Sequence, residues 1–162
     1  MTERKMMKEQ NKMKRIFVGI LVLVLVLSII PVRAVAEEKQ VETVYFEDGS
    51  YMTVELIAKS SRVSGSVSGS KTTTYNNSSG TALWKVTLTG NFSYTGSSAT
   101  CTSTAIDVTI LDSSWYTVYK TSGRSGNKAT GSATVGKSVG GTSVTKVPVS
   151  LTITCDANGN LS

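Results

Sequence analysis

Two cysteines and the absence of histidine limit the chemistry that this sequence can carry. Cys101 and Cys155 are the only cysteines among the 162 residues. Without histidine, the usual activation of a serine or cysteine nucleophile is excluded, and two thiols alone are too few ligands for a zinc site. No Cys-x-x-Cys spacing is present to lower a thiol pKa. The sequence therefore predicts one structural disulfide, which would close a loop of about 55 residues and stabilise the fold by about 4 kcal/mol.

Carboxylates are the other groups that could act in catalysis, and they are sparse in the C-terminal part of the chain. From residue 59 onward there are only Asp107, Asp112 and Asp156, each beside residues typical of a turn or a strand end. The segment 156–161 resembles a calcium-binding loop, but its sixth position is leucine instead of glycine and no bidentate glutamate follows. We therefore expect a terminal turn there, and no enzyme, no metal site and no cofactor.

Aromatic side chains offer a third kind of chemistry, which is stacking on the ring of a ligand. Regular strand alternation over 114–120 would place Trp115, Thr117 and Tyr119 on one face. An exposed row of this kind stacks on sugar rings, whereas a buried row belongs to the core. Because the chain has only three Phe and two Trp, the core interpretation is favoured, and Trp115 and Tyr119 stay the candidate binding face.

The N-terminal segment has the features of a secretory signal. Basic residues precede a run at 16–30 in which only a glycine and a serine are not large and apolar. This run is shorter than the roughly 20 residues that a membrane span needs, and the small residues Ala34 and Ala36 form a cleavage motif. We expect residues 1–36 to be removed, leaving Glu37 first, with an uncleaved anchor as the alternative. The predicted location is secreted and extracellular.

Charge is distributed unevenly along the remaining chain. Seven of the seventeen basic residues lie in the predicted signal peptide, so the basic character of the whole sequence does not indicate a nucleic-acid partner. Residues 37–58 carry six acids and one lysine, whereas 59–162 carry nine basic residues and three acids. Either both parts are ordinary solvated surfaces, or the acidic segment masks a basic domain that binds an anionic cell-wall polymer, a glycan or a membrane surface.

Hydrophobic alternation with a period of two predicts an all-β fold. Residues 37–58 are typical of an acidic β-hairpin around Asp48-Gly49, and residues 59–70 are rich in serine and glycine and predict a flexible joint. The rest, 71–162, is expected to form an antiparallel β-sandwich of immunoglobulin-like architecture. Its predicted strands are 71–76, 82–94, 99–110, 114–120, 127–136 and 143–155.

Three local features of these strands carry further predictions. A two-residue turn at Asp48-Gly49 would place Tyr45 opposite Met52. Cys101 has the opposite parity to the apolar residues later in its strand, so a β-bulge is needed to turn its side chain toward the core. Pro148 lacks a backbone donor, which predicts an edge position or a bulge for the last strand.

Five segments of the chain, 45–51, 79–86, 92–96, 125–129 and 151–162, carry a resemblance to a known group of proteins. They resemble an uncharacterised family of small secreted β-rich proteins from Gram-positive anaerobic bacteria. The resemblance implies secretion and β-structure, and it implies no activity.

These observations together predict a secreted, non-enzymatic surface or binding module. The alternative is a secreted antagonist or antimicrobial protein whose basic β-domain is masked by residues 37–58. Binding predicts a ligand without turnover, whereas an antagonist predicts growth inhibition that increases when residues 37–58 are removed.

Overall fold

The computed structural model describes residues 37–60 and 65–162. The predicted signal peptide 1–36, with its cleavage motif at Ala34 and Ala36, lies outside the described residues, as do residues 61–64 of the predicted joint. Glu37 is the first residue of the first strand.

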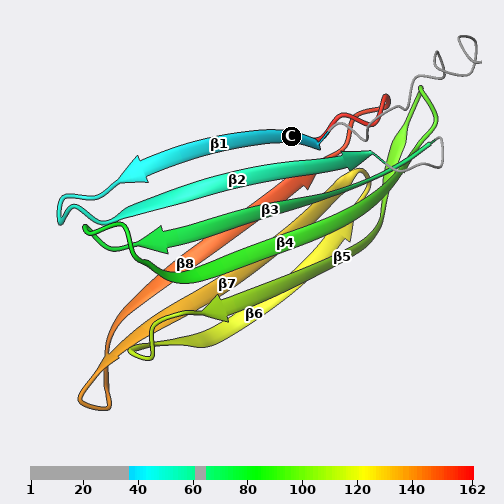
Figure 1. Cartoon of the computed structure of the whole chain (residues 1–162). Helices are drawn as coiled ribbons and strands as arrows, with labels where there is room; N and C mark the ends of the chain where they lie inside the picture. Colours follow the sequence, from blue (N-terminus) through cyan, green and yellow to red (C-terminus); the bar gives the residue numbers. More distant parts are fainter. Residues whose placement is uncertain (1–36, 61–64) are drawn as a thin grey trace, which may run out of the picture. The chain divides into compact units, whose positions relative to one another are not determined.

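The described chain is an all-β antiparallel sandwich of two sheets (Figure 1), which confirms the predicted fold class. One sheet has five strands in sequence order and the other has three, also in sequence order. The first contains β1 (Glu37–Tyr45), β2 (Tyr51–Ser60), β3 (Ser66–Asn76), β4 (Ala82–Tyr94) and β5 (Ala99–Ile110). The second contains β6 (Trp115–Ser125), β7 (Lys128–Val139) and β8 (Thr142–Thr154).

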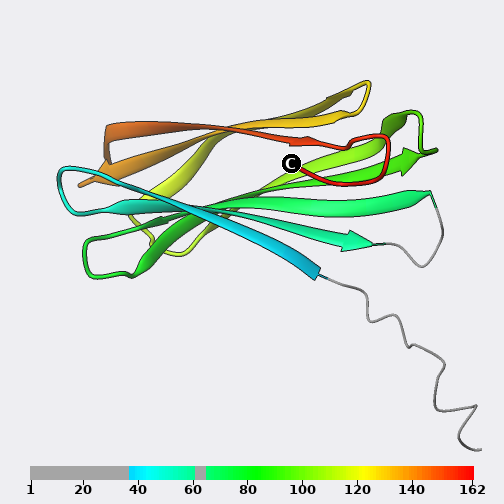
Figure 2. The same ribbon diagram turned by 90° about the horizontal axis from the view of Figure 1, so that it is seen from above.

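The two sheets pack so that β3 lies across from β8, β4 across from β7, and β5 beside β6 (Figure 2). Each sheet is a simple meander of hairpins, and only the β5–β6 connection passes from one sheet to the other. This connectivity differs from the Greek key of immunoglobulin domains, so the likeness to them is confined to the sandwich architecture. Strands β1 and β2 do not approach the backbone of the three-stranded sheet as closely as β3, β4 and β5 do.

The core lies between the sheets and follows the predicted alternation. Buried residues occur at every second position of β4 and of the later part of β8. Gly131 in β7 marks a close approach of the sheets, because a Cβ there would lie 2.9 Å from a terminal carbon of both Leu88 and Ile106. The largest fully buried side chains are Trp84, Phe92, Leu88, Ile153, Val86, Val135 and Cys155.

The register of the β1–β2 hairpin differs from the prediction by one residue. Tyr45 lies opposite Tyr51, not Met52. The turn has three residues between the paired Phe46 and Ser50, and among the described residues only glycines, including Gly49 at φ 78°, have positive φ. A two-residue type I′ turn would need Asp48 at positive φ as well, so a type I turn closed by a glycine bulge forms in its place.

The shifted register removes a repulsion between Glu42 and Glu55 that the predicted pairing implied. Glu55 lies opposite Val41, and Glu42 lies opposite Val54. The Lys39 Nζ atom is 3.2 Å from a carboxylate oxygen of Glu55 on the same face.

The predicted joint at 59–70 is mostly strand, which corrects the division of the chain at this point. Residues 59–60 end β2 and residues 66–70 begin β3, where Val67 is buried. Serine and glycine suit this strand because the backbone ladder with β2 satisfies its polar groups, and because Gly69 leaves room for Leu161. The acidic hairpin is therefore continuous with the sheet.

Two predictions about strand irregularity are confirmed. Along β5, Ser103 pairs with Asn91 and Cys101 with Phe92, so Thr102 is the extra residue of a bulge that turns Cys101 into the core. Pro148 lies in β8, the edge strand of the three-stranded sheet, where a missing N–H is tolerated.

Candidate functional site

The candidate site lies at the end of the sandwich that holds the β1–β2 turn, and its first part is the turn itself. The Asp48 carboxylate accepts hydrogen bonds from the backbone N–H of Ser50 at 3.0 Å and from the Ser50 hydroxyl at 2.5 Å. These two bonds hold the pKa of Asp48 below its ordinary value. The Tyr75 hydroxyl donates to the Ser50 Oγ atom at 3.0 Å, which ties the turn to β3.

A buried aromatic stack supports this turn from the core. The rings of Tyr75 and Trp84 stack with their centres 5.3 Å apart, and Trp115 meets the Tyr75 ring edge-on at 5.4 Å. The Phe46 ring extends the stack outward, 6.0 Å from Tyr75 and 42 % exposed. Offset and edge-on ring pairs contribute more stability than their buried area alone accounts for. The inner rings therefore hold the Phe46 ring in position.

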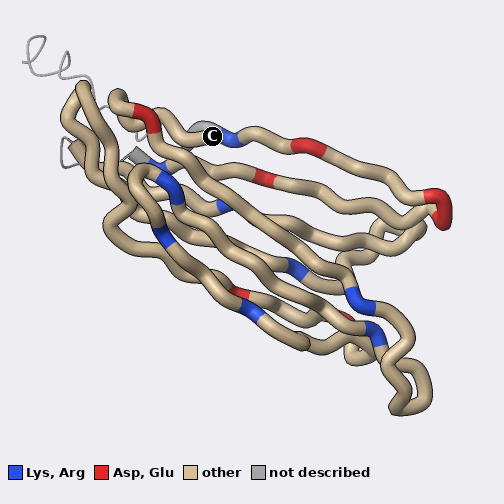
Figure 3. Tube along the Cα trace, turned by 180° about the vertical axis from the view of Figure 1, so that it is seen from behind, with Lys and Arg blue, Asp and Glu red and all other residues tan. Residues whose placement is uncertain are grey.

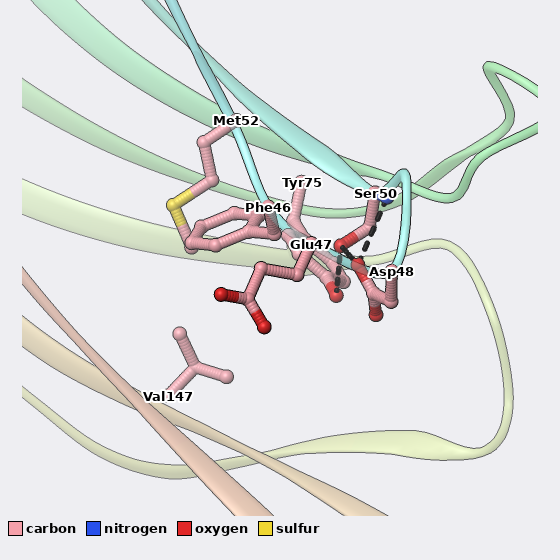
Figure 4. Close-up of a pocket in the computed structure, with 7 residues that line it drawn as sticks. All are labelled: Phe46, Glu47, Asp48, Ser50, Met52, Tyr75 and Val147. Carbon is pink, nitrogen blue, oxygen red and sulfur yellow. Dashed lines mark hydrogen bonds between the residues drawn. The ribbon is translucent and has the colours of Figure 1, made fainter.

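An open pocket of about 450 Å³ lies beneath the turn (Figure 4). Phe46 and the Glu47 carboxylate extend into it from the turn, opposite Val147 on β8. Its lining residues come from β1–β2, β3 and β8: Phe46, Glu47, Asp48, Ser50, Met52, Tyr75 and Val147. The lining combines apolar and aromatic surface with two carboxylates and carries no basic side chain, which suits a ligand that offers a ring face and hydrogen-bond donors.

A lysine lies near the site but does not line the pocket. The Lys137 Nζ atom lies 5.7 Å from the centre of the Trp115 ring, in a cation–π position. Its charge also contributes to the lowered pKa of both Asp48 and Asp112. The hydrogen bonds from Ser50 and Ser114 lower these two pKa values more than Lys137 does.

The three aspartates considered for catalysis hold local structure. Asp107 accepts from Lys120 Nζ at 3.0 Å, Asp112 accepts from Ser114 in the β5–β6 turn, and Asp156 accepts from backbone N–H groups of the terminal turn. These contacts lower the pKa of each carboxyl, so none of the three is suited to donate a proton at neutral pH. Within the described residues, no group of three acids or cysteines could hold a metal ion.

The lowered pKa values predict that acid weakens the fold. Each of these carboxyl groups has a lower pKa in the folded protein than in the unfolded chain, where it is about 4. Its contribution to the free energy of unfolding is therefore complete above about pH 4 and is lost as the pH falls through the pKa of the folded protein. We expect the thermal midpoint to be constant near neutrality and to fall below about pH 4. Asp48→Asn and Asp112→Asn should each reduce this pH dependence, measured by circular dichroism. A midpoint that stays unchanged down to about pH 2 would refute the assignment.

The two cysteines lie at the opposite end of β4 from Trp84, and both are buried. The predicted disulfide is not present in the structure, where Cys101 and Cys155 are free thiols. Burial raises the pKa of each thiol, and the negative charge of Asp156 raises the pKa of Cys155 further. Their backbone N–H groups donate to the carbonyls of the adjacent residues Gly126 and Asn127, at 2.8 and 3.0 Å. The backbones of the two cysteines are therefore held side by side on the same turn, while each thiol donates to a nearby carbonyl, that of Ser103 for Cys101 and that of Asp156 for Cys155.

The predicted binding face at Trp115 and Tyr119 is divided by a bulge. Thr117 pairs with Val135 and Tyr119 with Thr134, so Val118 is an extra residue that reverses the alternation. Trp115 belongs to the core, as favoured, whereas Tyr119 is 55 % exposed on the outer face of the three-stranded sheet. The two side chains do not form one surface.

Most of the pocket residues carry no signal in the sequence. Phe46 and Glu47 belong to the hairpin turn that the Asp-Gly signal identified, but no motif marked them as a site. Tyr75 and Val147 come from strands far apart in the sequence, and only the packing of β3 against β8 brings them together.

Residues 37–60 and 65–162 contain no helix that could span a membrane. The chain matches no protein-family model, and comparisons with curated proteins and with solved structures likewise find no significant match.

Proposed function

We propose that this chain is a secreted, non-enzymatic binding module that holds a glycan in the pocket beneath the β1–β2 turn. The observation that carries the proposal is the exposed Phe46 ring beside the Glu47 carboxylate, on a base of stacked buried aromatic rings. A sugar can stack the apolar face of its ring on an aromatic side chain. Its hydroxyl groups can donate hydrogen bonds to carboxylates. Among the partners considered, a glycan fits this lining better than an anionic wall polymer or membrane does.

Export is the second part of the proposal. It rests on the sequence of residues 1–36, which has the charge, length and small-residue motif of a secretory signal. The likeness to an uncharacterised secreted family from Gram-positive anaerobes agrees with export. In an oxidising compartment, the buried thiols of Cys101 and Cys155 would form the predicted bridge.

The alternative is an antagonist or antimicrobial protein unmasked by loss of residues 37–58, and the fold argues against it. Strand β2 pairs with β3 over ten residues, and Leu56 of β2 is buried in the core. Removing the segment would break this ladder and expose β3, so residues 37–58 are better described as part of the fold than as a releasable mask.

A pull-down against insoluble materials tests the glycan proposal. We expect the purified protein to be retained by a neutral polysaccharide or by wall glycan, and to stay bound at about 1 M salt, where exposed charges are screened. Phe46→Ala should weaken retention about tenfold, the loss of one aromatic contact of about 1.4 kcal/mol.

The control is Tyr119→Ala, which removes an exposed tyrosine from the other sheet and should leave retention unchanged. Retention only by anionic vesicles or anionic polymer, abolished by salt, would contradict the glycan site and return the basic-surface alternative to first place.

A further inference from the structure

The two sheets have very different outer edges. The edge of β8 is closed over its second half: Pro148 has no donor there, Ser162 pairs with Thr154 at 2.8 and 3.0 Å, and Lys71 Nζ donates to the Thr152 carbonyl at 3.3 Å. These are the ways in which natural sheets prevent an additional strand from pairing. Within residues 37–60 and 65–162, the edge of β1 has no proline and no further segment paired with it.

The backbone of β1 presents a row of unpaired groups to solvent. The Phe46 N–H donates to the Ser50 carbonyl, so the even-numbered residues of β1 bond to β2. In an antiparallel pair, the backbone N–H and C=O groups of the alternate residues point away from the partner strand. The groups of Lys39, Val41 and Thr43 therefore lie on the free edge of β1. No described strand lies beyond β1, and the strand contains neither proline nor glycine.

The side chains of β1 give this edge a specific chemistry. Val41, Val44 and Tyr45 are 53, 55 and 74 % exposed, with Val41 and Tyr45 on one face and Val44 on the other. Residues 37–48 contain five acids and one lysine, and acidic positions mark β1 and its turn in Figure 3. The lysine, Lys39, is paired with Glu55. A second copy of the same edge would bring like charges together, whereas a basic strand would be attracted.

We propose that β1 is a docking edge for an extended, basic segment of a partner protein, which adds to the five-stranded sheet as a sixth strand. The partner backbone would pair with Lys39, Val41 and Thr43, and its apolar side chains would cover Val41 and Val44. Its basic side chains would lie near Glu42 of β1. This surface is separate from the glycan pocket and does not depend on it.

Hydrogen exchange of the wild-type protein provides the first test. The probe is a nine-residue peptide that alternates valine or threonine with lysine, and the control peptide has glutamate in place of lysine. We expect the Val41 and Thr43 amides to exchange quickly in the free protein and to become protected by the lysine peptide only. No protection at about 1 mM peptide, the weak end of measurable affinity, would overturn the proposal.

Variants of one residue provide the second test. Thr43→Pro removes an N–H that β2 does not use and should weaken peptide binding at least tenfold, whereas Thr43→Val keeps the N–H and should bind as the wild type does. Glu42→Gln should weaken binding severalfold at low salt. Equal binding by Thr43→Pro and Thr43→Val, protection along β8, or dimerisation of the protein through β1 without peptide would each overturn the proposal.

Discussion

Replacing Trp84 with alanine is expected to lower the free energy of unfolding by about 3–5 kcal/mol, the range for deletion of a large buried aromatic side chain. Trp84 is fully buried, stacks on Tyr75 and lies 6.0 Å from the ring of Trp115. Its loss would leave a cavity between the sheets and remove the base of the Phe46 pocket. Urea unfolding followed by fluorescence or circular dichroism measures the change.

Trp84→Phe is the matched variant and should cost clearly less. The Trp84 Nε1 atom is buried and has no acceptor among the described residues. An unpaired buried donor costs about 1–3 kcal/mol, so phenylalanine offsets part of the lost packing by removing that donor. If Trp84→Ala cost less than about 1 kcal/mol, or if Trp84→Phe cost as much as alanine, the role given to the aromatic stack would be wrong.

Oxidation of Cys101 and Cys155 is expected to stabilise the protein by about 4 kcal/mol relative to the reduced form, because the bridge restricts the unfolded chain over about 55 residues. The β5 bulge turns Cys101 into the core, and the backbones of Cys101 and Cys155 bond to adjacent residues, so the bridge would link the start of β5 to the residue after β8. Cys101→Ser under oxidising conditions should unfold at the same urea concentration as the reduced wild type.

Intact mass provides the direct measurement for the bridge. Protein recovered without reductant should be lighter than the fully reduced chain by two hydrogens, and the raised thiol pKa values predict slow alkylation of the reduced, folded form. A mass equal to the reduced value would show that the buried thiols stay free.

The sequence was most informative where one physical signal dominates. Alternation bounded by turn residues located 82–94 and 99–110, which are the observed β4 and β5. The parity of Cys101 required a bulge, and the missing N–H of Pro148 required an edge or a bulge, of which the structure has the edge. Both predictions follow from the geometry of the backbone alone.

The sequence was least informative where a local residue pattern is compatible with two different backbone structures. Asp48-Gly49 indicates a turn, but the choice between two and three loop residues moved the hairpin register by one. The serines and glycines of 66–70 suggested a joint, although pairing with β2 makes them a strand. The bulge at Val118 had no marker in the sequence and separated Trp115 from Tyr119. The pocket depends on contacts between distant strands, which no spacing encodes.

A nuclear magnetic resonance titration with the retained glycan tests the central claim most directly. Backbone amide shifts are expected to concentrate at Phe46, Glu47, Tyr75 and Val147, around the pocket beneath the β1–β2 turn. At a glycan concentration near the wild-type Kd, the shifts should be several times smaller in Phe46→Ala, in line with the tenfold weaker binding. Shifts centred on Tyr119 and the outer face of the three-stranded sheet, or no shifts with any glycan, would contradict the assignment of this pocket as the binding site.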